Sequence, residues 1–138
     1  HDYQVRQVED TADELAAFQE LSEHLPDNPR ELKRLINVHR LIRLLARQSG
    51  WRPGPADRRL IVGWLLLCFA RPDAAEQLIN AAREDPETAI LVLDEEHQRF
   101  LGSDGDTDLT AAQLAPGTPL GEAWEIAALF RRNAAPNG

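Results

Sequence analysis

The stretch that decides the fold is Leu25-Pro-Asp-Asn-Pro-Arg-Glu-Leu-Lys-Arg-Leu-Ile-Asn-Val-His-Arg40. Asn28 is a good N-cap residue, because its side-chain oxygen can accept from the free N–H groups of a first helical turn. Pro29 loses no hydrogen bond at the first helical position. Glu31, three residues after the cap, completes a capping-box pattern. These signals predict that a helix begins at Pro29.

This helix is predicted to run through residue 48, because Gly50 then supplies a C-terminal stop signal. At about 100° per residue its apolar side chains form one broad face, and its basic side chains gather on the opposite side. The predicted apolar face consists of Leu32, Leu35, Val38, Leu41, Ile42, Leu45 and Ala46. The predicted basic face consists of Lys33, Arg40, Arg43 and Arg47.

Two side chains break this division. Arg34 projects at the N-terminal end of the apolar face, and His39 falls within that face. Burying an unpaired cation is very unfavourable, so Arg34 needs an anion. One interpretation is an intramolecular partner such as Glu14 or Glu20. The other is that Arg30 and Arg34 lean over the helix N-terminus towards a phosphate or carboxylate from outside this segment. For His39 we expect a hydrogen-bonded core histidine.

The string Asn28-Pro-Arg-Glu-Leu-Lys-Arg-Leu-Ile-Asn37, followed by Val38-His-Arg-Leu41, resembles the PR-x-x-KR-x-x-N signature of KAP-type P-loop NTPases. In that family the signature opens a helical region that follows the nucleotide-binding core. The resemblance is tight within this string and, over the rest of the chain, extends only to a helical, Leu-rich character. It implies a domain whose helices close over a nucleotide bound elsewhere in the parent protein.

By position, the resemblance makes Arg30 and Arg34 the nucleotide-sensing candidates, with Asn28, Lys33 and Asn37 as supporting motif residues. The sequence departs from the family because it contains no G-x-x-x-x-G-K-[ST] loop to cradle phosphates. We therefore expect no catalytic residue and no hydrolysis by this chain alone. ATP and magnesium are implied for the parent protein and not for this chain. The implied partner is the upstream NTPase core of the same polypeptide.

Composition favours helix over sheet, and together with the helical segments it predicts an all-α fold, a compact bundle of about six helices without a sheet. Hydrophobic residues make up 43% of the 138 residues and aromatic residues only 6%, and Ala and Leu dominate the apolar set. The net charge is −8. Between Arg30 and Arg47 six basic residues face one acid, so this segment carries +5 and the remainder −13. Overall acidity argues against a nucleic-acid partner. We expect one helical domain over 1–132 and a flexible tail over 133–138.

Capping patterns, prolines and apolar runs place the other helices. The segment 60–70 is apolar on all sides and predicts the central buried helix. With eleven residues it is too short to cross a bilayer, which needs ~20, so membrane association is possible but not favoured. The expected helices cover residues 11–24, 56–70, 72–83, 87–101 with a break near Asp94, 108–114 and 121–132.

Cys68 is the one cysteine and lies in the apolar run, so no disulfide can form within the chain. We expect a cytoplasmic protein and no catalytic thiol. The histidines His24, His39 and His97 are too scattered to predict a zinc site. His97, which follows Glu95 and Glu96, reads as part of a surface cluster.

Two strings imitate known sites. Ala89-Ile-Leu-Val-Leu-Asp-Glu95 has the form of a Walker B strand, but no phosphate loop precedes it, so we expect a helix there. Asp104-Gly-Asp-Thr-Asp108 echoes the first half of a calcium loop. The sixth and twelfth positions hold Leu109 and Ala115 where an EF-hand needs glycine and glutamate, so an exposed turn is expected.

Two other functions stay open. The basic helix 29–48 could bind an acidic protein partner in a stand-alone interaction domain with no nucleotide involved. Self-association through exposed Leu and Trp side chains is a further alternative, with Trp51, Trp64 and Trp124 as candidates.

Overall fold

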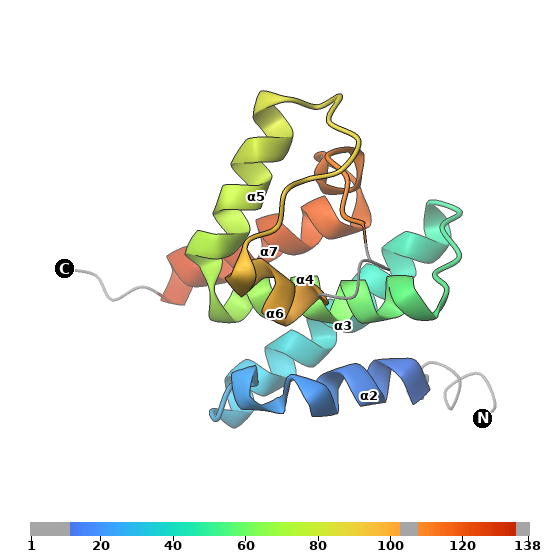
Figure 1. Cartoon of the computed structure of the whole chain (residues 1–138). Helices are drawn as coiled ribbons and strands as arrows, with labels where there is room; N and C mark the ends of the chain where they lie inside the picture. The colour runs from blue at the N-terminus through green and yellow to red at the C-terminus, as the bar shows by residue number, and fades with distance from the viewer. Residues whose placement is uncertain (1–11, 103–107, 135–138) are drawn as a thin grey trace.

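The computed structural model describes residues 12–102 and 108–134. Within these ranges the chain forms six α-helices, two 3-10 turns and no strand, which confirms the all-α prediction (Figure 1). The elements are α2 (Ala12–Glu20), η1 (Ser22–His24), α3 (Pro29–Gln48), α4 (Pro55–Ala70), α5 (Pro72–Glu84), α6 (Glu95–Leu101), η2 (Ala112–Leu114) and α7 (Pro119–Ala134).

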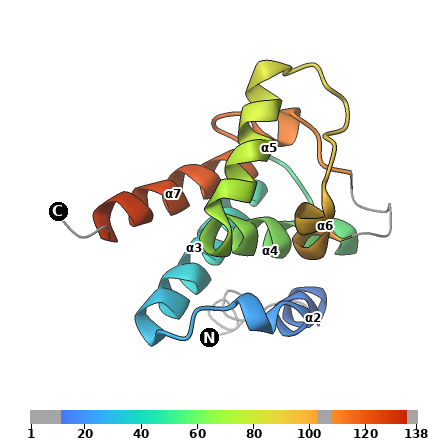
Figure 2. The ribbon, with the colours of Figure 1, turned by 60° about the vertical axis from the view of Figure 1, so that its left-hand side comes forward.

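The predicted central helix is α4. All nine residues from Leu60 to Cys68 are buried, and α2, α5, α6 and α7 all pack against this helix. In both views α2 lies on one side of α4 and α5 rises from the other (Figures 1 and 2). A helix that is hydrophobic all round is stable in water only when neighbours cover every side. The apolar run therefore explains why the other helices pack around α4.

The bounds of α3 agree with the predicted helix. Asn28 Oδ1 accepts a hydrogen bond from the backbone N–H of Arg30 at 2.8 Å, as expected of the cap. The buried side chains of α3 are Leu35, Val38, His39, Ile42 and Ala46. Leu41 was predicted to face the core, and this is wrong, because its side chain is 39% exposed. The buried stripe is narrower than the apolar face of the sequence.

The segment between α5 and α6 differs from the prediction. Residues 85–94 are not helical, and α6 begins only at Glu95, capped by Asp94. The backbone N–H of Leu91 donates to the carbonyl of Leu109 at 2.8 Å, so this segment pairs locally with a distant part of the chain. Leu91 is 5% exposed and the next residue, Val92, is 90% exposed, so neighbouring side chains of this segment point to opposite sides. The helix expected over 108–114 is reduced to η2.

The N-terminal helix is also shorter than predicted. Instead of continuing to His24, α2 ends at Glu20 and a separate 3-10 turn follows. The predicted cap, Thr11, lies outside the described residues, as do the calcium-like residues 103–107 and the last four residues of the expected tail.

Two of the three tryptophans belong to the core. Trp64 is fully buried, and its indole Nε1–H donates to the carbonyl of Leu120 at 2.8 Å. Trp124 is 7% exposed, with the Arg131 guanidinium 4.9 Å from its ring centre. Neither indole is available for self-association. None of the helices in the described ranges has the length and apolarity that crossing a bilayer requires.

Candidate functional site

The motif residues occupy the first three turns of α3. Arg30, Lys33 and Asn37 are exposed, and Arg34 is partly exposed. At 100° per residue these four positions fall within an arc of about 100° on the outward side of the helix. The N-cap at Asn28 fixes where this arc begins. The helix start therefore presents three cations and an amide together.

Arg34 is held from two directions. Its Nη1 donates to Glu31 Oε1 at 3.2 Å, and its guanidinium carbon lies 5.5 Å from the ring centre of Phe130 on α7. The partner is thus neither Glu14 nor Glu20, the intramolecular carboxylates considered from the sequence. The Arg34 side chain is 38% exposed, so it lies at the edge of the core and not within it. An exposed pair one helical turn apart contributes little to stability.

The two carboxylates considered as partners of Arg34 contact other side chains. Glu14 is 2% exposed; its Oε2 lies 2.9 Å from His39 Nε2 and 3.5 Å from Arg43 Nε. His39 is equally buried, and its ring meets that of Phe18 edge-on at 5.2 Å. His39 is therefore a core histidine, as predicted. Its contact with a buried carboxylate ties α3 to α2.

Glu20, at the end of α2, pairs with Arg59 of α4. Arg59 Nε and Glu20 Oε2 are 3.2 Å apart, and Arg59 Nη1 also donates to the carbonyl of Phe100 at 2.6 Å. Arg59 thereby links α2, α4 and α6, while Glu20 itself stays largely exposed.

Aliphatic side chains accompany the basic ones on the outward side of α3. Ile36 is 37% exposed, Leu41 39% and Leu44 47%. Each stands within a turn of an exposed cation, Lys33 or Arg40. We call the surface formed by Arg30, Lys33, Ile36, Arg40, Leu41 and Leu44 the outer face of α3. A cationic surface is electrostatically complementary to an acidic partner.

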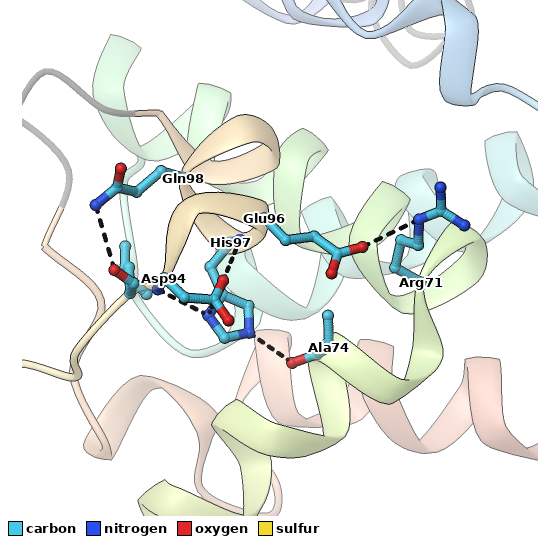
Figure 3. Close-up of polar contacts among 7 residues, drawn as sticks. Arg71, Ala74, Asp94, Glu96, His97 and Gln98 are labelled. Atoms are coloured by element: carbon cyan, nitrogen blue, oxygen red, sulfur yellow. Dashed lines mark hydrogen bonds and ion pairs between the residues drawn. The ribbon is translucent and has the colours of Figure 1, made fainter.

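His97 is buried, which corrects its assignment to a surface cluster. It is 3% exposed and stands at the third position of α6 (Figure 3). Its Nδ1 accepts from the backbone N–H of Asp94 at 3.2 Å, so Nε2 carries the proton and donates to the carbonyl of Ala74 at 2.8 Å. The Asp94 carboxylate in turn accepts a hydrogen bond from the backbone N–H of His97 at 2.8 Å. These bonds make His97 a structural link between α5 and α6.

The neighbouring acids belong to this helix start and not to a Walker B strand. Asp94 caps α6, and Glu96 pairs with Arg71 at 3.1 Å (Figure 3). Residues 89–93 form neither the strand of a Walker B motif nor the predicted helix.

Cys68 is enclosed at the C-terminal part of α4. Burial raises the pKa of its thiol well above the usual range, and the nearby charge of Arg131 opposes the rise only in part. The thiol is therefore protonated at neutral pH and a poor nucleophile. Among residues 12–102 and 108–134, no three His, Cys, Asp or Glu side chains are grouped so that they could hold a metal ion.

No protein-family model, curated protein or solved structure matches the chain. The family resemblance thus depends on the residues of the Asn28–Asn37 string alone.

Proposed function

We propose that this chain is the helical lid and sensor domain of a KAP-like P-loop ATPase. It docks on the nucleotide-binding core of the same polypeptide and couples nucleotide state to conformation, without catalysing hydrolysis itself. The parent protein is an ATPase that uses ATP and magnesium, and it acts in the cytoplasm. The observation that supports this function best is the shared outward arc of Arg30, Lys33, Arg34 and Asn37 on one capped helix.

Arg34 is the stronger sensor candidate because its side chain is held in place while most of its hydrogen-bond donors remain available. A guanidinium has five N–H donors, and here one bond goes to Glu31 while the ring of Phe130 supports the flat face. The remaining donors can reach a phosphate or carboxylate oxygen. Since the exposed bond to Glu31 is weak, an incoming anion can compete for Arg34 at small cost.

The outer face of α3 supplies the docking surface. Ile36, Leu41 and Leu44 offer apolar area, while Arg30 and Lys33 offer charge to a core that holds phosphates. On its inner side α3 packs against α7 and α4. Movement of α3 upon docking would therefore be passed to the centre of the bundle.

Arg34→Ala in the full-length protein is expected to lower ATP turnover at least about tenfold, because a cation near the transferred phosphate is lost. The helical content of the variant should be unchanged, since Arg34 contributes little to the core. Arg99→Ala is the matched control, as Arg99 is an exposed arginine on α6. Turnover of the Arg34 variant equal to that of the Arg99 variant would contradict the sensor role.

The alternative is a stand-alone interaction domain that binds an acidic protein through the same outer face of α3. The exposed aliphatic side chains favour it, because they need no nucleotide to explain them. In that case Arg34→Ala would leave ATP turnover unchanged, while partner binding by this chain would weaken steeply with salt.

A further inference from the structure

A second basic feature lies at the opposite end of α3. The end of this helix, the connector 49–54 and the start of α4 line an open pocket of about 490 Å³, to which Glu14 of α2 also contributes. Its lining residues are Glu14, Arg43, Arg47, Gly50, Trp51, Arg52, Pro53, Arg58 and Ile61. We call this cavity the arginine pocket. Small-molecule sites occupy roughly 300–1,000 Å³, so it has room for a ligand.

The described lining of the arginine pocket has more cations than anions, although the chain carries −8 overall. Of the residues that the structure describes, four arginines and one carboxylate, that of Glu14, line it. That carboxylate already faces His39 at 2.9 Å and Arg43 at 3.5 Å. Arg47 and Arg52 are exposed, and no carboxylate within the described ranges forms an ion pair with either. Among the described residues, Arg47 and Arg52 thus line the cavity without an ion-pair partner of their own.

The helix dipole does not account for this concentration of charge. The negative C-terminal end of α3 attracts Arg47 and Arg43, which stand in its last turns. Arg52 and Arg58, however, come from the connector and from α4. Arg58 Nη1 donates to the carbonyl of Pro53 at 2.7 Å, so the folded connector itself holds this side chain at the pocket. Three separate elements thus supply cations to one cavity.

We propose that the arginine pocket binds a small, multiply charged phosphate compound. Guanidinium groups approach from several sides, which suits tetrahedral phosphate oxygens better than a single planar carboxylate. Arg43 and Arg58 form ordered walls, and Arg47 and Arg52 close on the anion. Trp51 adds an indole surface for the rest of the ligand. Arg47 lies thirteen residues after Arg34, about 20 Å along the helix, so this site is separate from the proposed sensor and does not depend on it.

Calorimetric titration of the 138-residue chain with inorganic pyrophosphate tests the proposal. We expect saturable 1:1 binding that weakens as salt rises. The double variant Arg47→Ala/Arg52→Ala should lose at least about tenfold in affinity, since charge-assisted bonds are lost. Both side chains are exposed, so the variant should fold normally. Arg99→Ala, which removes an exposed cation of α6 outside the pocket, should bind as the unchanged chain does.

Further arms identify the source of the phosphate. Titration with a soluble inositol polyphosphate tests a free ligand, and sedimentation with phosphoinositide-containing vesicles tests a lipid headgroup. In either arm, loss of binding in the Arg47/Arg52 variant and not in the Arg99 variant supports the pocket. Absence of saturable binding to all three probes, or equal loss in both variants, would overturn it. Neither result bears on the ATP turnover of the Arg34 variant.

Discussion

Glu14→Ala is expected to lower the free energy of unfolding by about 3 kcal/mol or more, because it removes a buried carboxylate that contacts both His39 and Arg43. Glu14 and His39 are each only 2% exposed, and Arg43 also contacts Glu14. Removing one partner of such a cluster uncovers the full desolvation cost of the others. Urea unfolding followed by circular dichroism measures the change.

The control for this variant is Glu20→Ala on the same helix. The carboxylate of Glu20 also pairs with an arginine, but its side chain is 64% exposed, so the expected loss is at most about 1 kcal/mol. Glu14→Gln should fall between the two, because the amide oxygen can still accept from His39 while the charge is gone. Equal losses for Glu14→Ala and Glu20→Ala would show that the buried cluster does not hold α2 to α3.

Gly63→Ala is expected to destabilise the protein by about 2–3 kcal/mol, because the added methyl group has no space. A Cβ at Gly63 would collide with the backbone carbonyl of Phe100 and would lie 2.8 Å from Arg59 Nη1. The carbonyl belongs to α6 and cannot rotate away, so α6 would have to move off α4. The bond from Arg59 to that carbonyl would be strained as well. Thermal unfolding measures the loss.

Gly54→Ala provides the comparison, since nothing lies within 4 Å of a Cβ there and its φ is negative. Alanine is a poorer N-cap than glycine, so a small loss of about 0.5–1 kcal/mol is expected at this position. If Gly63→Ala proved no worse than Gly54→Ala, the close approach of α4 and α6 would be wrong.

Local signals explain why much of the fold could be predicted. Asn28 with Pro29 marks the start of α3, and Gly50, at φ 84°, follows its end, so both bounds could be read directly. The apolar run 60–70 has only one stable place, the centre. The prediction of a helix over 87–94 was wrong because the apolar character of this segment is typical of a buried helix. The backbone hydrogen bond between Leu91 and Leu109 joins parts of the chain that are far apart in sequence, so local signals do not predict it.

The candidate site could be predicted only in part, for the same reason. The string that opens α3 places Arg30 and Arg34 on one helix, but the stacking on Phe130 comes from α7. The spacing of the arginines in the sequence does not predict the arginine pocket, because the pocket forms only when α3, the connector and α4 come together. His97 was wrongly predicted to lie on the surface because its neighbours in sequence, Glu95 and Glu96, are charged. Its own side chain, three residues after the Asp94 cap, is buried in the core.

The central claim is that the start of α3 docks on a nucleotide-binding core. Lys33 is the chain's one lysine, stands in the middle of the motif and is exposed. The most direct test is the rate of amine labelling at Lys33, followed by mass spectrometry, in the full-length protein with a non-hydrolysable ATP analogue and in this chain alone. Docking predicts labelling at least about tenfold slower in the nucleotide-bound full-length protein, since burial restricts access. Equal rates would contradict the account.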